Sequence, residues 1–258
     1  PFSVADFARR LFDLGGPATV ISSACSSSAK VFASARRMIA AGLIDAALVG
    51  GVDSLCLTTL YGFNSLGLLS DEACRPCDAE RKGLSIGEAS AFALLERAPE
   101  EPDDDAILLL GVGESSDAHH MSSPHPEGLG AQQAMQAALA MAGLTPAAID
   151  YINLHGTATV NNDAAEEKAV TAVFGTSGND GRCATPCSST KGATGHTLGA
   201  AGGVEAVICA LALQHDLIPA GIHTRRLDPQ LHLDYVLENR HQPLHHVLSN
   251  SFGFGGTN

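Results

Sequence analysis

Short apolar runs of strand length alternate with segments of helical periodicity along the whole chain. In the first part, residues 18–24, 46–53 and 90–97 are apolar runs, and a helix is predicted over residues 25–41. Apolar positions within that helix recur at spacings of three and four, which is the period of one helical face. Strands that alternate with helices predict an α/β fold built from layers of sheet and helix.

An acidic, proline-containing stretch, APEEPDDD at residues 98–105, interrupts this alternation. The pattern then restarts, with strands predicted at residues 106–113, 151–156 and 245–252 and helices at residues 130–143, 164–175 and 199–214. A polar break between two series of elements predicts two halves, residues 1–98 and residues 99–258.

The charge balance and the cysteine content restrict the class of protein. The 258 residues carry a net charge of −13, which argues against nonspecific binding to nucleic acid or to an anionic membrane. No apolar run is expected to reach the ~18 residues of a membrane span, and no signal peptide is recognised. Seven cysteines are an odd number without a secretory context, so a reduced, cytoplasmic protein is expected.

The stretch ISSACSSSAK places Cys25 between a predicted strand and a predicted helix. At a helix N-terminus the free N–H groups and the helix dipole favour a thiolate by ~0.3–1 kcal/mol. One pKa unit corresponds to about 1.4 kcal/mol, so the dipole alone lowers the pKa of the thiol by less than about one unit. Cys25 is therefore either a nucleophile with a further activating partner or a buried core thiol.

Two of the 11 histidines lie in settings that suit such a partner. His155 follows an apolar run in NLHGTAT, and His196 lies in the glycine-rich KGATGHTLGAAG, with Lys191 before it and Glu205 after it. Glycines let the backbone approach a ligand closely. An ordinary packed or surface role is the alternative for each histidine, but the pair favours a site shared with Cys25.

Four motifs in this order resemble those of one enzyme family. ACSSS, HGTAT followed by ND, KGATGHTLGAAG and NSFGFGGTN are similar to motifs of the β-ketoacyl-[acyl-carrier-protein] synthases, specifically the elongating type I/II enzymes with a Cys-His-His centre. Residues 74–96, CRPCDAERKGLSIGEASAFALLE, also resemble that family. The resemblance implies a thiolase-like fold of two similar halves in α-β-α-β-α layers.

The same resemblance implies a truncated chain. Only 24 residues precede Cys25, whereas the family has a substantial segment before the strand that leads to its cysteine. A short final strand after NSFGFGGTN is also expected to be missing. The first half is therefore expected to be incomplete, and the chain to be shortened at the N-terminus and slightly at the C-terminus.

The resemblance further implies roles for the motif residues. Cys25 takes an acyl group from a carrier-protein thioester, while His155 and His196 bind the thioester oxygen of malonyl-carrier protein as CO2 leaves. The backbone N–H groups of Cys25 and Phe254 form the oxyanion hole, and Phe254 in its glycine-flanked loop is a gate. The implied reaction is a decarboxylative Claisen condensation to 3-oxoacyl-carrier protein, in fatty acid or type II polyketide or polyene biosynthesis.

Four charged residues receive catalytic or supporting roles from the resemblance. Lys191 is counted among the catalytic residues, and Glu205 completes a charge pair with it beside the histidines. Asp163 and Glu166 match acidic positions that order the site. No cofactor and no metal are implied.

An acyl carrier protein is the partner that the resemblance implies. Thr157 and Thr159 are expected to hydrogen-bond its phosphopantetheine arm. Basic side chains are sparse, and they are either solvated surface charges or part of a docking patch for the acidic carrier protein. These residues are Lys30, Arg36, Arg37, Arg75, Arg81 and Lys82. The intact protein is expected to be a homodimer or a synthase heterodimer, with no nucleic acid bound and no membrane span.

Three alternatives stay open at this point. A thiolase-type acyltransferase shares the fold and the nucleophile, but its second catalytic cysteine belongs near the C-terminus, where this chain has NSFGFGGTN. A non-catalytic partner of the chain-length-factor type typically lacks the cysteine. A zinc-binding structural module would use the pairs Cys74 with Cys77 and Cys183 with Cys187.

Overall fold

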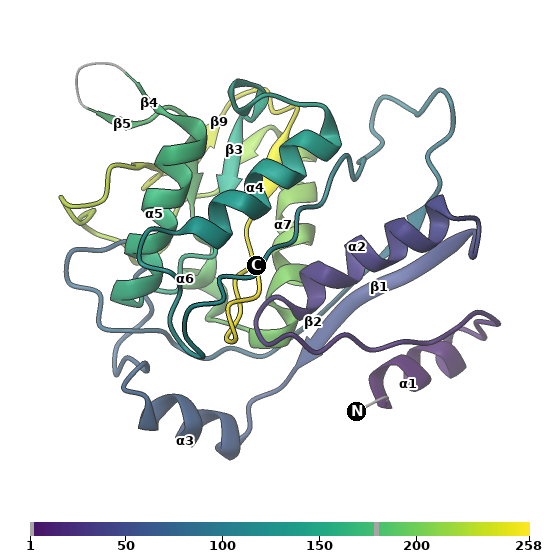
Figure 1. The fold of residues 1–258 in the computed structure, drawn as a ribbon, viewed down its shortest axis with the longest axis horizontal. Helices are drawn as coiled ribbons and strands as arrows, with labels where there is room; N and C mark the ends of the chain where they lie inside the picture. Colours follow the sequence, from purple (N-terminus) through teal and green to yellow (C-terminus); the bar gives the residue numbers. More distant parts are fainter. Residues whose placement is uncertain (1–2, 178–180) are drawn as a thin grey trace.

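The computed structural model describes residues 3–177 and 181–258, which form two main sheets and two short two-stranded pairs, with helices packed between and around the main sheets (Figure 1). β1 (Ala46–Asp53) and β2 (Ala89–Glu96) pair as an antiparallel ribbon. The second sheet is parallel, in the order β10 (Val247–Ser249), β3 (Tyr151–Asn153), β6 (Pro186–Ser188) and β8 (Asp234–Tyr235). The predicted α/β class is confirmed.

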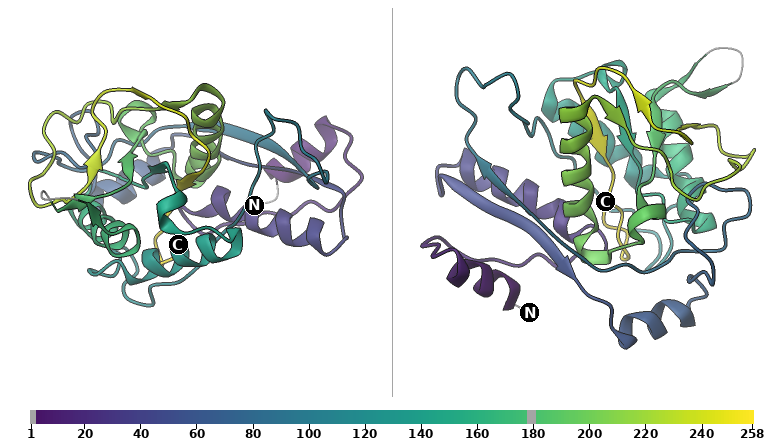
Figure 2. Two further views of the ribbon diagram at one scale, coloured as in Figure 1. Left: turned by 90° about the horizontal axis from the view of Figure 1, so that it is seen from above. Right: turned by 180° about the vertical axis from the view of Figure 1, so that it is seen from behind.

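One helix lies between the two sheets. α7 (Ala201–His215) packs against β1 and β2 on one side and against β10 on the other, as the views of Figure 2 show. α2 (Ser27–Ala40) packs on the same ribbon and on α7. Small residues allow this close approach, because a Cβ at Gly202 would lie 2.6 Å from the backbone nitrogen of Ala29. The helix that follows Cys25 is therefore joined to α7 by backbone-to-backbone packing.

The central helix corrects one expectation. The run Leu198–His215 is long and apolar enough, by length and composition alone, to cross a membrane, so the expectation that no run reaches this length is wrong. The helix buries Glu205 and packs on both sheets. The core helix of a layered α/β protein has the same length and composition.

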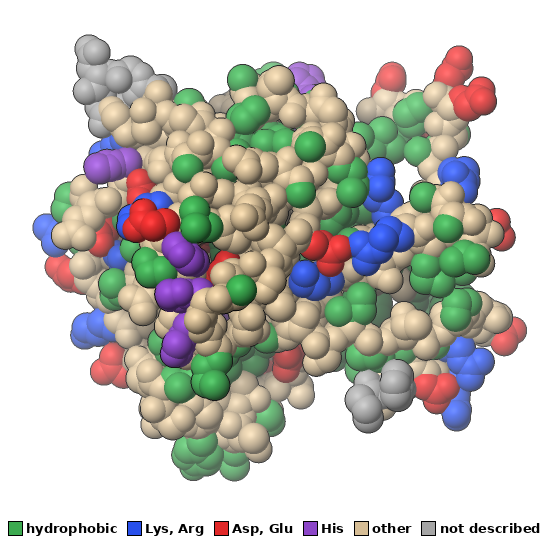
Figure 3. Space-filling view, viewed as in Figure 1, with side chains coloured by type: hydrophobic (Ala, Val, Ile, Leu, Met, Phe, Trp, Pro, Cys, Tyr) green, Lys and Arg blue, Asp and Glu red, His purple; other side chains and the backbone are tan. Residues whose placement is uncertain are grey.

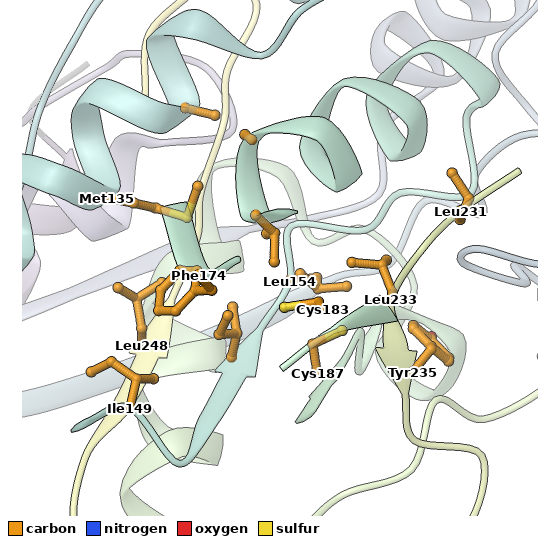
Figure 4. Close-up of a cluster of buried hydrophobic side chains, with 14 of the residues drawn as sticks. Met135, Ile149, Leu154, Phe174, Cys183, Cys187, Leu231, Leu233, Tyr235 and Leu248 are labelled. Carbon is orange, nitrogen blue, oxygen red and sulfur yellow. The ribbon is translucent and has the colours of Figure 1, made fainter. Parts of the chain in front are cut away.

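The parallel sheet is covered on both faces. β3 is buried throughout, which is typical of a parallel strand between helical layers. On one face, Ile152 joins an apolar cluster with side chains of α4 (Leu129–Ala142) and α5 (Val160–Phe174), part of which is shown in Figure 4. On the other face, Tyr151 lies in a second cluster with Ala212 of α7. This packing fixes where the segments that leave β3 and β10 begin.

The remaining elements of the described residues are short. They are α1 (Ser3–Leu11), α3 (Leu57–Ser65), η1 (Pro146–Ala148), β4 (Thr176–Ser177), β5 (Arg182–Cys183), α6 (Lys191–Thr194), η2 (Leu198–Ala200), β7 (Leu217–Ile218) and β9 (Arg240–His241). α1 and α3 project at the edge of the body (Figure 1). The division into residues 1–98 and 99–258 stays a prediction.

Two predicted strands are wrong. Residues 18–24 have no regular structure in the described chain apart from a single bridge between Ser23 and Cys25. Residues 106–113 also form no strand, and residues 106–110 are exposed. An apolar run becomes a strand only where a neighbour completes its backbone hydrogen bonds, and no strand of the described residues pairs with either run. The other predicted strands and helices are present, with their ends shifted by a few residues.

The packing of α2 on α7 leads to a test of stability. We expect Gly202→Ala to lower the free energy of unfolding by about 1–3 kcal/mol, because the added methyl group collides with the backbone of α2. Gly16→Ala is the matched control, since nothing lies within 4 Å of a Cβ at that position. Thermal and urea denaturation of both variants measure the difference; equal stability of the two variants would contradict the packing.

Candidate active site

Cys25 lies in a tight turn just before α2, and we call residues 23–26 the nucleophile turn. The helix begins at Ser27, so the prediction that it begins at Cys25 is wrong by two residues. Ala24 has a positive φ of 52°, which is strained for a residue with a Cβ. The hydroxyl of Ser27 donates a hydrogen bond of 2.6 Å to the carbonyl of Ala24 and accepts one of 2.9 Å from the backbone N–H of Ser23. Short side chains therefore hold the thiol in a fixed direction.

The thiol of Cys25 is uncharged in this environment. Its residue is 5% exposed, and burial raises the pKa of Cys25 to about 12 because the thiolate would lose its hydration. The positive charge of Lys191 acts in the opposite direction, and the carboxylates of Asp53 and Glu205 add to the rise. The thiolate that a helix N-terminus favours is therefore not the resting state of this site.

His155 and His196 face each other in the same pocket. Their ring centroids are 5.3 Å apart and the rings are almost perpendicular, at 87°. His155 follows β3, and His196 lies between α6 and η2, where its N–H donates to the carbonyl of Ser85 at 2.7 Å. Burial, and then the charge of Lys191, hold the pKa of both histidines well below the usual range. Both rings are therefore neutral near pH 7.

A buried ion pair stands behind the histidines. Lys191 of α6 and Glu205 of α7 are both almost fully buried and paired with each other. The Lys191 Nζ atom lies 3.5 Å from Nδ1 of His155. An ammonium group can only donate, so Nδ1 accepts and the ring proton of His155 lies on Nε2. Burial raises the pKa of Glu205, against the opposing effect of Lys191, and Ser251 donates to its second oxygen at 3.4 Å.

Two carboxylates of α5 hold the segment that carries His155. Glu166 accepts hydrogen bonds of 2.8 Å from the backbone N–H groups of His155 and Gly156. Asp163 accepts one of 3.1 Å from the N–H of Thr157. Burial raises the pKa of Glu166 to about 7, and the hydrogen bonds from Gly156 and His155 act against this rise. Burial also raises the pKa of Asp163, against the backbone N–H of Cys77 and the charge of Arg81. Both side chains order the backbone and neither lines the pocket.

Phe254 lies in a loop closed by hydrogen bonds between Gly253 and Thr257, at 2.7 and 3.1 Å. Its ring stacks on Phe63 of α3, with centroids 5.4 Å apart and an angle of 20° between the planes. Gly255 and Gly256 have positive φ, so the turn requires residues without a Cβ. Phe63 was not singled out from the sequence, since no local pattern marks an aromatic residue that meets a loop 191 positions away.

One pocket of about 290 Å³ collects most residues with predicted direct roles, but Lys191, predicted to be catalytic, does not line it and lies behind His155. Its lining includes Cys25, His155, His196, Phe254, Thr157 and Thr159. The hydroxyl groups of the two threonines lie 2.8 Å apart at the pocket wall. The predicted supporting residues stand behind this surface. The arrangement can hold a thioester between a thiol and two neutral N–H donors.

The basic residues do not share one surface. Of the six, only Arg81 and Lys82 line the pocket. Arg81 is wrongly predicted as a surface charge: its side chain is 4% exposed and pairs with Asp163 at 3.5 Å and with Asp228 at 2.7 Å. Lys30 pairs with Glu114 at 3.3 Å. On the face shown in Figure 3, basic and acidic side chains are interspersed.

Arg37 joins the same acidic partner as Lys30, at 2.6 Å from Glu114. Arg75 pairs with Glu72 at 2.7 Å, and its side chain is only 9% exposed. Arg36 lies beside Arg37 on α2. Most of the predicted docking residues are therefore partnered within the chain.

The four cysteines considered as zinc ligands are all buried. Cys77, Cys183 and Cys187 belong to the apolar cluster between the parallel sheet and its helices, and the last two are labelled in Figure 4. Cys74 contacts the carbonyl of Thr157 instead, at 3.6 Å. Within residues 3–177 and 181–258, no group of three or more histidine, cysteine or acidic side chains is arranged to hold a metal ion.

Comparison with known proteins agrees with this geometry. Residues 5–101 match the N-terminal domain of the β-ketoacyl synthases, and residues 107–225 match their C-terminal domain. The chain is 39% identical to a mitochondrial 3-oxoacyl-[acyl-carrier-protein] synthase of Arabidopsis thaliana, over 94% of this chain and 55% of the relative. It is also 39% identical to 3-oxoacyl-[acyl-carrier-protein] synthase 2 of Rhizobium meliloti, over 95% and 60%.

Solved structures give the same result for the fold. A ketosynthase from Xenorhabdus doucetiae, solved in complex with its chain length factor, superposes with a TM-score of 0.89 at 48% identity, over 98% of this chain and 61% of that one. A β-ketoacyl synthase from Burkholderia phymatum gives 0.90 at 34%, over 100% and 64%. The thiolase-like fold is thus confirmed, and the chain spans about three fifths of these proteins. Because matches to the N-terminal and C-terminal domains of the β-ketoacyl synthases follow in order along the chain, this chain belongs to the β-ketoacyl synthase family.

Proposed function

We propose that this chain carries the catalytic centre of a 3-oxoacyl-[acyl-carrier-protein] synthase, in fatty acid or type II polyketide or polyene biosynthesis. The observation that carries the proposal is the single pocket in which Cys25 meets two buried, neutral histidines. Relatives named as 3-oxoacyl-[acyl-carrier-protein] synthases support it. The reaction is a decarboxylative Claisen condensation in two stages, both at this pocket.

Acyl transfer is the first stage. The sulfur of Cys25 attacks the carbonyl of an acyl thioester, its proton passes to the departing thiol, and the acyl group stays on Cys25. The backbone N–H groups of Cys25 and Phe254 stabilise the negative oxygen of the intermediate. Because the resting thiol is protonated, loss of its proton accompanies the attack.

Condensation is the second stage. A malonyl thioester places its carbonyl oxygen between His155 and His196, whose neutral rings donate hydrogen bonds to the enolate that forms as CO2 leaves. The position of Lys191 supports an Nε2–H donor on His155. The enolate carbon then attacks the acyl-Cys25 carbonyl. A carbon–carbon bond forms, the carbon–sulfur bond breaks, and 3-oxoacyl thioester leaves.

The surrounding residues position these groups. The Lys191–Glu205 pair holds α6 to α7, and Asp163 and Glu166 hold the backbone after β3. Thr157, at the pocket wall, faces the path of a phosphopantetheine arm and donates to or accepts from its amides, with Thr159 beside it.

The proposed partners are an acyl carrier protein and a second synthase chain, either a copy of this chain or a chain-length-factor-like subunit. A ketosynthase of Xenorhabdus doucetiae is solved with its chain length factor, which supports the second partner. The outer face of the β1–β2 ribbon exposes Val52, Phe92 and Leu94, as expected of a covered surface. The cytoplasm is the proposed compartment.

Acylation of Cys25 tests the first stage. We expect the full-length protein to gain the mass of one acyl group when it is incubated with acyl-carrier protein, and Cys25→Ala to gain none. Cys56→Ala removes an exposed thiol and is the matched control, which should acylate normally. Intact-mass and peptide-mass spectrometry locate the adduct. Robust thiolysis of acetoacetyl-CoA, without acylation by the carrier protein, would favour a thiolase-type enzyme instead.

The histidines should separate the two stages. We expect His155→Ala and His196→Ala to retain acylation of Cys25 but to lower decarboxylation of malonyl-carrier protein by about 10²–10³-fold, since each removes one donor to the enolate. Release of labelled CO2 measures this step. His241→Ala, an exposed histidine, serves as the control. If both variants decarboxylated as fast as the control, the two histidines would not have the proposed role.

The protonated thiol should give a distinctive pH profile. The pKa of Cys25 is raised to about 12, so the thiolate is a minor species at neutral pH. We expect alkylation of Cys25 by iodoacetamide to accelerate about tenfold per pH unit between about pH 7 and pH 10, without a plateau. Cys56 is an internal comparison, because the hydroxyl of Thr59 lowers its pKa. A plateau for Cys25 near neutral pH would contradict the burial argument.

A further inference from the structure

Cys25 and His196 are each followed, three residues later, by a residue that forms a hydrogen bond to a distant part of the chain. Ser28 follows the nucleophile turn, and its hydroxyl accepts a hydrogen bond of 2.9 Å from the N–H of Gly203. Gly199 follows His196, and its N–H donates at 2.9 Å to the carboxylate of Asp53, the last residue of β1. The first hydrogen bond therefore ties α2 to the start of α7, and the second ties the segment after His196 to the end of β1.

These two hydrogen bonds cross a tightly packed contact between α2, β1 and residues 199–203. We call the packing of α2 and β1 against residues 199–203 the small-residue seam. A Cβ at Gly51 would lie 2.7 Å from the Cβ of Ser28, and one at Gly199 would lie 3.1 Å from the Asp53 carboxylate. With no large side chains to interlock, the hydrogen bonds to Ser28 and Asp53 set the register across the seam.

Asp53 differs from Ser28 in carrying a charge. Any acceptor could bond the N–H of Gly199, but a carboxylate also places a negative charge near the nucleophile. The charged groups that act on the Cys25 thiol are Lys191, which favours the thiolate, and Asp53 and Glu205, which oppose it. Asp53 is half-buried, so solvent screens its charge only in part.

Among the described residues Asp53 forms no ion pair, and its carboxylate accepts the hydrogen bond from Gly199. Glu88 lies beside it, just before the facing strand, and accepts a hydrogen bond of 3.1 Å from Leu55. Opposite Asp53 in the ribbon is Ala89. The nearby thiol of Cys56 also experiences the charge of Asp53.

We propose that Asp53 is a positioning residue of this site: its carboxylate holds residues 196–199 to the end of β1, on which α2 packs, and its negative charge slows the reaction of the resting Cys25 thiol. The proposal rests on the proposed function, in that Cys25 and His196 act together. A protonated thiol resists oxidation and alkylation, so the charge of Asp53 adds to the protection that burial already gives Cys25.

Three substitutions separate the two parts of the proposal. Asp53→Asn keeps an oxygen acceptor for the N–H of Gly199 and removes only the charge. Ser28→Ala removes the other anchor and leaves the charge, and Asp53→Ala removes both charge and anchor. All are made in the full-length protein with Cys56→Ser, so that alkylation reports on buried Cys25. Asp45→Asn, an exposed residue just before the other end of β1, is the matched charge control.

The first measurement is the rate of Cys25 alkylation by iodoacetamide against pH, which needs no condensing activity. We expect Asp53→Asn to move the rising limb to lower pH by about half a unit, so that the rate at a fixed pH increases about threefold. Asp45→Asn and Ser28→Ala should leave the limb in place. A merely structural role for Asp53 would not move it. If the alkylation rates of Asp53→Asn and Asp45→Asn rise over the same pH range, the proposed effect of the Asp53 charge on Cys25 is overturned.

The second measurement is decarboxylation of malonyl-carrier protein, which depends on His196. We expect the decarboxylation rates of Asp53→Ala and Ser28→Ala to be about tenfold or more below that of Asp53→Asn. The reason is that a small displacement of His196 weakens its hydrogen bond to the enolate. Equal rates for these variants overturn the positioning part. If Asp53→Ala does not fold, Ser28→Ala and Asp53→Asn still decide the comparison. If the unsubstituted protein does not decarboxylate, the proposed function fails, and the alkylation profile alone decides the role of Asp53.

Discussion

The buried ion pair between Lys191 and Glu205 is the interaction on which the geometry of the site depends. It joins α6 to α7 at the point where the parallel sheet meets the central helix, and its lysine lies 3.5 Å from the ring of His155. Removing one partner of a buried pair costs about 3–5 kcal/mol, because the other charge is left without compensation. The pair therefore links stability and the protonation state of His155 in one contact.

Burial has opposite consequences for the thiol and for the histidines, and together they define the resting site. It raises the pKa of Cys25 to about 12 and lowers the pKa of His155 and His196, so all three groups are neutral. Neutral donors and a neutral nucleophile suit the proposed reaction, in which the thioester oxygen gains negative charge only as the reaction proceeds. The carboxylates of Asp163 and Glu166 are kept behind the pocket wall, where backbone N–H groups satisfy them.

Much of this arrangement could be predicted from local patterns. Strand and helix periodicity identified the α/β class, and β1, β2 and the helices α4, α5 and α7 lie close to their predicted positions. The runs at residues 18–24 and 106–113 were misread because hydrophobicity reports burial potential, whereas a strand also needs a partner for its hydrogen bonds. The motifs around Cys25, His155, His196 and Phe254 did locate the residues that line one pocket.

The sequence by itself therefore determined the fold class, the family and the identity of the groups with chemical potential, because those follow from periodicity and from motif order. Only the tertiary structure decided their states and their partners. Phe63 meets Phe254, and Asp53 meets Gly199, across long stretches of chain, and Arg81 is buried against Asp163 rather than exposed. The physical reason is that hydration and charge pairing depend on what surrounds a side chain in space, which no local pattern contains.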